Sequence, residues 1–537
     1  MTAVASSPAQ SQQLPSSAAA PGINPWIVAL VVSMATFMEV LDTSIANVSL
    51  PHIAGGLAAT VDEATWVLTS YLVANAVVLP ASGWLSTVFG RKRFYMTCVA
   101  LFAVSSFLCG IATSLPMLIV FRVLQGMGGG GLAPSEQSIL ADTFTPRQRG
   151  MAFALYGIAV VVAPAVGPTL GGWITDNYTW RWIFFINVPV GILSLVLTHM
   201  VVRDPPELQA ARKRRLKGGL KIDYIGFGLI ALGLGCLQVV LDKGQEEDWF
   251  SSTFITLFTI AAAFGLIVGA LWELNVEQPV VDLPMLKDRT FAISNLVMFA
   301  IGVILFGSTV VLPLFMQQML GYTAQLAGLA ITPGGFVVMA LMPLVGYLVG
   351  HVQAKYLVMF GLLTTALALW HMTGLDLNAS FSTMVWMRIF QAAGLAFLFV
   401  PTNTAAYANL PPDKSNNASA LLNLSRNLGG SVGISVAQTL LARRGQFHQS
   451  RLASHVTAFS PFTSRTLAGA TRALTGHSGA GSTHQAQGML MGIVERQASM
   501  LSYIDVFLVL ALASAVMIPV VMLMKSNKPG QGGGAMH

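Results

Sequence analysis

Two carboxylates lie inside the first long apolar run of the chain, residues 26–48, where they could carry out proton chemistry. Glu39 and Asp42 are three residues apart, so a helix places them on one face. The other polar residues of this face are Thr36, Thr43 and Asn47. An ionisable group in a membrane helix costs about 2.5–3.5 kcal/mol on insertion scales, so this face must line a cavity or contact another helix.

A carboxylate whose proton affinity changes with its surroundings can take up a proton on one side of a membrane and release it on the other. We assign this role to Asp42. Glu39 is either a second proton site or a group that tunes the pocket for cations. The alternative for both is a static buried ion pair that only fixes helix packing.

Four further ionisable residues lie within apolar runs: Arg122, Glu136, Arg388 and Arg426. Arg122 lies at the depth of Asp42 in a run of opposite direction, so the two could pair, and Arg122 would be a structural partner and a modulator of proton affinity. Glu136 lies fourteen residues after Arg122, on nearly the same face of the same predicted helix. This spacing places it about 21 Å closer to the cytoplasm, too far to reach Asp42. It is an inner relay, a cation site or a carboxylate near the membrane interface.

Arg388 and Arg426 are the charges well inside the spans of the C-terminal half. Each either binds a substrate anion or neutralises a helix end. The residues that we assign to the substrate cavity are Asn47, Gln125, Glu136, Arg388 and Arg426.

Composition places these residues in a membrane protein. The chain has 537 residues, of which 54% are apolar and 9% charged, against roughly 25% charged in ordinary globular proteins. Its pI near 9.4 arises from basic residues in short connectors, so no nucleic-acid partner is expected. Cys98, Cys109 and Cys236 all fall inside apolar runs, so neither a disulfide framework nor a zinc site is predicted. We expect no metal and no cofactor.

A bilayer core of about 30 Å needs about 20 apolar residues per helix, which predicts about fourteen spans. They lie near 26–48, 64–86, 94–112, 116–141, 150–174, 182–202, 222–241, 252–273, 291–319, 324–350, 355–374, 381–409, 416–441 and 501–524. Lys and Arg gather in alternate connectors, so the positive-inside rule places both termini in the cytoplasm. Segment 442–500 also carries arginines but is extracytoplasmic by parity.

An internal repeat divides the spans. Arg122-x-x-Gln125 is echoed 266 residues later by Arg388-x-x-Gln391, and Gly83-x-Leu85 is echoed 263 residues later by Gly346-x-Leu348. We therefore predict an all-α membrane protein with two six-helix bundles and two inserted helices, with a substrate site between the bundles. The predicted parts are a disordered cytoplasmic tail (1–25), the N-terminal bundle (26–202), a basic cytoplasmic linker (203–221), the inserted helices (222–273), a second cytoplasmic linker (274–290), the C-terminal bundle (291–524) with the extracytoplasmic loop 442–500, and a cytoplasmic tail (525–537).

Six segments in order carry a family resemblance. They are Leu41 to Val48 (LDTSIANV), Gly83 to Arg93 (GWLSTVFGRKR), Arg122 to Gly126 (RVLQG), Gly167-Pro168-x-x-Gly171-Gly172, Trp180 to Gly191 (WRWIFFINVPVG) and Asp223 to Gly226 (DYIG). Together they resemble the fourteen-span drug:proton antiporters of the major facilitator superfamily, the EmrB/QacA group, over residues 26–524. One departure is Thr87, which stands where the superfamily has an acidic residue in its first cytoplasmic turn, and this puts the gating salt bridge of that turn in doubt.

The resemblance implies a major facilitator fold in a bacterial inner membrane and no enzymatic step. It implies a proton-coupled exporter of drug-like, hydrophobic or cationic molecules, with a periplasmic adaptor and an outer-membrane channel as possible partners. It assigns conformational gating to Gly83, Gly90, Arg91, Gly167, Pro168, Gly171 and Gly172. The alternatives are an exporter of one endogenous metabolite or siderophore-like compound and, more remotely, a membrane enzyme or channel. The glycines at 126–131 also match G-x-G-x-x-G, but without the strand that a dinucleotide site requires.

Overall fold

The computed structural model describes residues 23–145, 147–204, 209, 223–276, 279–408, 410–411, 414–457, 461–478 and 482–525. Every regular element in these ranges is a helix. The α-helices of the first half are α1 (Pro25–Val48), α2 (Leu50–Gly56), α3 (Val61–Ala64), α4 (Trp66–Phe89), α5 (Arg91–Gly110), α6 (Leu115–Gly129), α7 (Leu132–Thr143), α8 (Arg149–Asn177), α9 (Trp182–Phe185) and α10 (Asn187–Val201). The remaining α-helices are α12 (Tyr224–Lys243), α13 (Thr253–Asn275), α14 (Arg289–Gln318), α15 (Ala324–Val349), α16 (Ala354–Met372), α17 (Phe381–Tyr407), α18 (Ser415–His455), α19 (Pro461–Ser478) and α20 (Ser482–Met522), with the 3₁₀ turns η1 (Trp249–Ser251) and η2 (Leu283–Lys287).

Thirteen helical segments in the described part of the chain are long and apolar enough to cross a membrane. The fourteenth crossing is α18, which contacts α14, α20 and α4. Polar residues in the middle of α18, among them Asn423, Arg426 and Asn427, keep its hydropathy below that of the other thirteen. The protein is therefore an all-helical, multi-pass membrane protein, as the sequence predicted.

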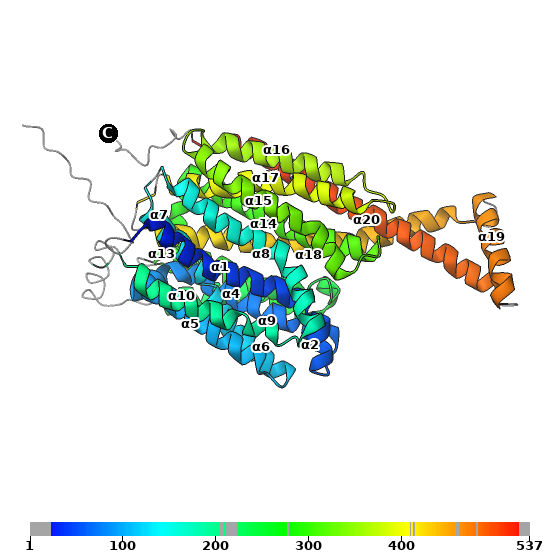
Figure 1. Ribbon diagram of the computed structural model, residues 1–537, viewed down its shortest axis with the longest axis horizontal. Coiled ribbons are helices and arrows are strands. Elements are labelled where there is room, and N and C mark those ends of the chain that lie inside the picture. The colour runs from blue at the N-terminus through cyan, green and yellow to red at the C-terminus, as the bar shows by residue number, and fades with distance from the viewer. Residues whose placement is uncertain are drawn as a thin grey trace, which may run out of the picture.

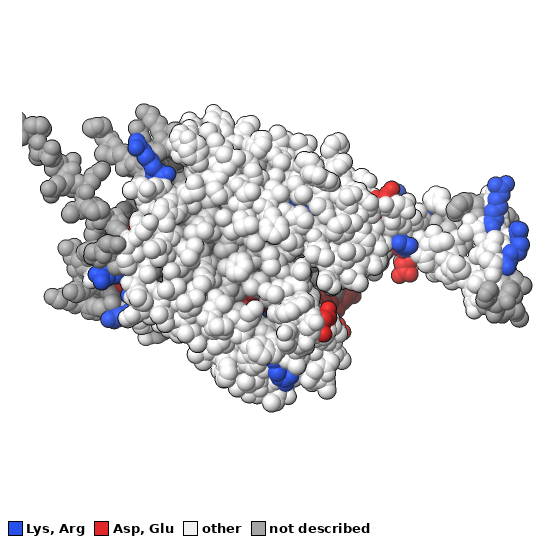
Figure 2. Space-filling model, viewed as in Figure 1, with Lys and Arg blue, Asp and Glu red and all other residues white. Residues whose placement is uncertain are grey.

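The helices run roughly side by side, and the molecule has two distinct ends (Figure 1). We call the end where α1 begins and α20 finishes the terminal end, and the opposite end, from which α18 and α20 project, the hairpin end. Charged side chains gather at these ends and on the projection, while the flank between them is nearly free of charge (Figure 2). A charge-free band between two charged ends is what a bilayer requires.

Local sequence explains where the crossings start and break. Asn24, Ser114, Thr323 and Ser380 each accept a backbone N–H at a helix start. Gly90, with φ of 90°, separates α4 from α5, a conformation that glycine adopts without strain. The fourth crossing breaks into α6 and α7 at Gly130 and Gly131.

The crossings pack as two groups. α1 to α10 contact one another in the first group, and α14 to α20 do so in the second. The groups meet mainly where α8 contacts α15 and where α4 and α7 contact α18. The inserted pair, α12 and α13, packs closely at Gly233 and Gly265, as small residues allow in membranes. α12 also reaches both groups, since Gln238 accepts from Ser431 at 2.8 Å and Asp242 accepts from Thr69.

One prediction was wrong. Segment 442–500 is not a loop in its described parts: α18 continues to His455, α19 follows, and α20 begins at Ser482. Together they form a helical projection beyond the bundle (Figure 1). The polar composition of this segment suggested a loop. A helix outside the membrane, however, needs no apolar run, and no proline interrupts α18. Most of the predicted tails and of the basic linker 203–221 lies outside the described residues.

Candidate functional site

Asp42 lies at the centre of a buried polar cluster in the first group of helices. Its carboxylate accepts from Arg122 Nη1 at 2.6 Å, from Gln125 Nε2 at 3.0 Å and from Asn187 Nδ2 at 2.7 Å. These partners come from α6 and α10, so three crossings meet at one carboxylate. Only 2% of Asp42 and none of Arg122 is exposed. The predicted pairing of Asp42 with Arg122 is confirmed.

The guanidinium of Arg122 is positioned by other parts of the same group. Its Nε donates to the Val67 carbonyl at 3.0 Å, and its Cζ lies 4.3 Å from the ring centre of Tyr71. Nη1 also donates to Gln125 Oε1 at 2.8 Å, which orients the amide N–H of Gln125 towards Asp42. Nη2 is buried without a hydrogen-bond partner in the described structure. Contacts from α4 and α6 thus hold the guanidinium of Arg122 against Asp42 of α1.

Glu39 lies one helical turn from Asp42, towards the terminal end. It accepts from Asn75 Nδ2 at 3.1 Å and from the Tyr71 hydroxyl at 3.4 Å, both on α4. No described cation forms an ion pair with it. Tyr71 thus contacts both Glu39 and Arg122, and it links the two carboxylates of α1.

Glu136 of α7 completes a row of acidic groups along α1. Its side chain is completely buried and accepts from Ser33 at 2.5 Å, two turns from Glu39 towards the terminal end. Its contact is thus with Ser33 and not with Asp42. Glu136 is therefore buried between α7 and α1, and its role stays a prediction.

A second polar network joins the two groups of helices. Arg426 Nη1 donates to the Tyr156 hydroxyl at 2.8 Å, and that hydroxyl donates to Asn423 Oδ1 at 3.2 Å. Asn423 in turn donates to Gln137 at 2.9 Å. Arg426 lies in the interior of α18, so it does not neutralise a helix end.

Two residues assigned to the cavity stand apart from these networks. Asn47 has an exposed side chain near the end of α1 and does not join the Asp42 cluster. Arg388 is buried in the interior of α17, where Nη1 donates to Gln391 Oε1 at 2.8 Å. Arg388 lies seven residues after Phe381, the first residue of α17, so it does not neutralise an end of this helix.

Arg91 connects the two groups at the terminal end. It is 2% exposed and forms an ion pair with Asp142 at 2.5 Å. It also donates to Asn416 at 2.9 Å and to Ser415 at 3.2 Å, both on α18. Thr87, which replaces the family's acidic residue, accepts from Asn416 at 3.4 Å. Asp142 therefore supplies the negative charge that the turn itself lacks.

The glycine motif of α8 brings this helix against α1. A Cβ on Gly167 would collide with Ser44, and a Cβ on Gly171 would lie 3.0 Å from Ile45 Cγ2. Gly172 has open space around it, and Pro168 lies inside the helix. Gly167 and Gly171 thus allow close contact beside the segment that carries Asp42, while no packing reason requires Gly172.

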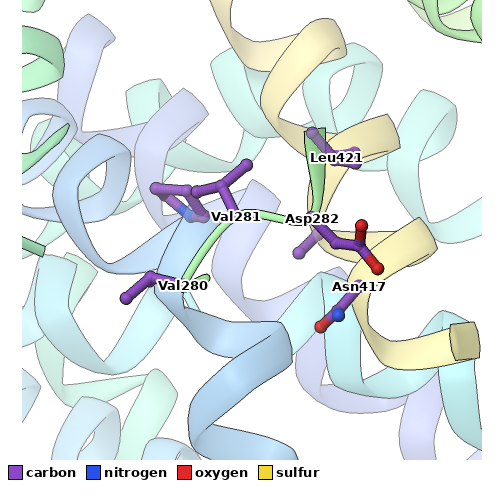
Figure 3. A pocket seen from close by; sticks show the side chains of 7 residues that line it. Val280, Val281, Asp282, Asn417 and Leu421 are labelled. Atoms are coloured by element: carbon purple, nitrogen blue, oxygen red, sulfur yellow. The ribbon is translucent and has the colours of Figure 1, made fainter. Parts of the chain in front are cut away.

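Near the terminal end, the linker after α13 enters the space between the two groups. Val280, Val281 and Asp282 line a small hollow with Pro80 of α4 and the start of α18 (Figure 3). Asp282 pairs with Lys414 at 2.8 Å. The hollow has no enclosed room for even a water-sized sphere, so it does not correspond to a drug-sized site of roughly 300–1,000 Å³.

Sequence reasoning missed the neutral members of these networks. Asn187, Tyr71, Asn75, Tyr156 and Asn423 were not identified as site residues. Asn187 could have been found, since it is a polar residue within the apolar run 182–202 and within a family motif. Tyr71 and Tyr156 could not, because a tyrosine in a span is usually a packing residue.

Comparison with known proteins places these features in a family context. Residues 32–434 match the Major Facilitator Superfamily. The chain is 37% identical over 514 residues to the multidrug export protein EmrB of Escherichia coli, covering 95% of this chain and 98% of that one. It is 37% identical over 509 residues to the fatty acid resistance protein FarB of Neisseria gonorrhoeae, covering 94% and 97%. The structure of the proton:xylose symporter XylE superposes with a TM-score of 0.56 at 16% identity, covering 91% and 94%, which shows the shared fold alone.

Proposed function

The chain belongs to the major facilitator superfamily and to its group of EmrB multidrug export proteins, and from this premise we propose that it is a proton-coupled exporter of drug-like, hydrophobic or cationic molecules. The observation that carries this proposal is the buried pair of Asp42 and Arg122. A carboxylate held by a cation on another helix can exchange its proton when the helices move. No enzymatic step is proposed.

The row formed by Asp42, Glu39 and Glu136 supports a route for the proton along α1. Each carboxylate is buried against a different helix, and they follow one another towards the terminal end. Protonation of Asp42 would weaken its bond to Arg122 and favour rearrangement of α1 against α6 and α8. We propose that the substrate and the proton favour different arrangements of α1 against α6 and α8, so that binding of one promotes release of the other, as antiport requires.

The test of the function is transport by inverted membrane vesicles that contain the protein. A panel of hydrophobic dyes, cationic drugs and amphipathic acids is offered with a proton gradient, without one, and with vesicles that lack the protein. Gradient-dependent accumulation of several unrelated compounds is expected. Accumulation of one compound alone would favour the exporter of a single metabolite, and accumulation without a gradient would contradict proton coupling.

We propose that the protein lies in the bacterial inner membrane with its terminal end in the cytoplasm. The Lys- and Arg-rich connectors predicted at this end support that orientation. Phosphatase fusions, which are active outside the cytoplasm, are expected to be inactive after Lys217 and active after Ser478. Equal activity at both positions would contradict the proposed orientation.

We further propose that the projection formed by α19 and the adjoining ends of α18 and α20 contacts a periplasmic adaptor in a tripartite pump. Met489, Met491 and Ile493 of α20 are 55%, 67% and 50% exposed, and the projection to which this part of α20 belongs extends past the rest of the bundle (Figure 1). Exposed apolar side chains outside the membrane are typical of a protein contact. A photo-crosslinker at Met491 is expected to capture an adaptor in the native host, while one at the lipid-facing Leu512 of the same helix is not. Capture from neither position would count against the adaptor.

A further inference from the structure

Arg388 is a buried cation in a group of helices that offers it no carboxylate. Between residues 289 and 494 the sequence contains only two acidic residues, Asp376 and Asp413. Asp376 is exposed in the connector before α17, and Asp413 lies outside the described residues, in the connector after it. On α20, Glu495 is exposed and Asp505 pairs with Arg444 at 2.5 Å. Among the described residues, no carboxylate forms an ion pair with Arg388.

The first half of the protein shows what this arginine and its neighbour can bind. Arg122 Nη1 donates to Gln125 Oε1 at 2.8 Å, and Arg388 Nη1 donates to Gln391 Oε1 at the same 2.8 Å. In the first half, the arginine and the glutamine amide N–H together hold the carboxylate of Asp42. In the second half, Gln391 Nε2 and Arg388 Nε are buried and have no described partner. The carboxylate-binding donors are repeated, but the carboxylate is not.

The equivalent position on α14 does not supply the missing acid. The repeat offsets of 263 to 266 residues place the counterpart of Asp42 within residues 305–308, which read Leu, Phe, Gly and Ser. The same offsets place the counterpart of Tyr71, which covers Arg122, within residues 334–337, which read Gly, Gly, Phe and Val. At Gly334 a Cβ would lie 2.9 Å from Arg388 Cγ, so the glycine makes room for the arginine side chain.

The pair lies directly behind the contact between the two groups of helices. On α15, the residue after Gly334 is Gly335, where a Cβ would lie 3.1 Å from Ala165 Cβ of α8. Thr332, two residues earlier, donates to the Ala165 carbonyl at 3.4 Å. This part of α8 adjoins Gly167 and Pro168. Arg388 of α17 thus packs against the part of α15 that contacts α8, next to the contact between the two groups of helices.

We propose that Arg388 and Gln391 form an anion subsite that receives the carboxylate of an amphipathic substrate. The guanidinium and the amide N–H donate to the substrate carboxylate as Arg122 and Gln125 donate to Asp42. The apolar part of such a substrate lies between the two groups of helices. This inference rests on the proposed export function, and it deepens that function by naming the residues that bind the acidic group of such substrates.

The test compares two ligands with the same ten-carbon chain and opposite charge, decanoate and decyltrimethylammonium. Binding to the purified full chain in nanodiscs is measured by calorimetry in chloride-free buffer, with empty nanodiscs as the blank. Arg388→Gln is expected to lower the affinity for decanoate by about tenfold or more, the effect of a lost charge-assisted hydrogen bond. Affinity for decyltrimethylammonium should stay within about twofold. Arg388→Lys, which keeps the charge, should lie in between.

Two further variants test the amide donor of the subsite and control for a general effect of charge. Gln391→Leu keeps the arginine and removes the amide donor, so it should weaken decanoate binding by about threefold to tenfold. Arg451→Gln removes the same charge from an exposed arginine on the projection, and it should leave the affinities for both ligands unchanged. Unchanged decanoate binding by Arg388→Gln and Gln391→Leu would overturn the proposal. Equal loss of both ligands would also overturn it, because Arg388 would then support the pocket and not the anion.

A chloride titration separates the substrate carboxylate from an inorganic anion. Thermal stabilisation by chloride that disappears in Arg388→Gln, with decanoate binding independent of Arg388, would assign the site to chloride and overturn the proposal. These measurements use no proton gradient. A protein that binds decanoate through Arg388 but transports nothing in vesicles would refute the export function and leave the subsite intact.

Discussion

Replacing Asp42 with asparagine is expected to reduce proton-driven export to the level of vesicles without the protein. The amide keeps the shape of the side chain and can still accept from Asn187 and Arg122, but it cannot titrate. Substrate binding in detergent should survive, because the amide resembles the protonated carboxyl group, and its pH dependence should flatten. Asp42→Glu is expected to retain partial export with a shifted pH optimum. Vesicle transport and binding titrations between pH 5 and 9 measure both effects.

The competing interpretation of Asp42 makes a different prediction. If the pair with Arg122 only holds the helices together, Asp42→Asn leaves a buried guanidinium without its counter-charge, which costs about 3–5 kcal/mol. Expression and thermal stability would then fall, while the protein that folds would couple export normally. Asp62→Asn, at an exposed carboxylate before α4, is the matched control and should change neither export nor stability. Normal export by well-expressed Asp42→Asn would move the proton site to Glu39.

Replacing Arg91 with alanine is expected to open the terminal end of the molecule. Arg91 joins α5 to Asn416 and Ser415 of α18 through two hydrogen bonds from a charged donor. Such bonds contribute about 1.5–3 kcal/mol each, and each 1.4 kcal/mol is a factor of ten in an equilibrium. The conformation with this end closed should therefore lose about 100-fold or more in relative population. A cysteine introduced at Ser419, which is buried against Ser138, should become reactive to a water-soluble maleimide.

The neighbouring residues provide the controls for Arg91. Arg93 is exposed, and Arg93→Ala should leave the labelling of Ser419→Cys unchanged. Asp142→Asn keeps the hydrogen-bonding shape beside Arg91 but removes the charge, so it should give an intermediate labelling rate. Equal labelling in Arg91→Ala and Arg93→Ala would show that Arg91 does not hold this end closed. Export should fall in Arg91→Ala because antiport needs both closed states.

The charged residues that make chemistry possible were predictable from the sequence. Asp42, Glu39 and Arg122 stand out because charge within an apolar run is costly and must be compensated. The number of crossings follows from the bilayer thickness in the same way. The repeat of Arg122-x-x-Gln125 at Arg388 also needs no structure, since it is a matter of spacing alone.

The tertiary structure decided which of these residues meet. Arg122 pairs with a carboxylate and Arg388 does not, although their local sequences are alike, because only α1 carries an acid at the facing position. Glu136 proved to be buried against Ser33, and the polar segment 442–500 proved to be helical in its described parts. Periodicity and composition report the environment of a residue along its own helix. The partner across a helix contact depends on how helices far apart in the sequence pack, and for Asn187 and Arg91 only the folded protein shows it.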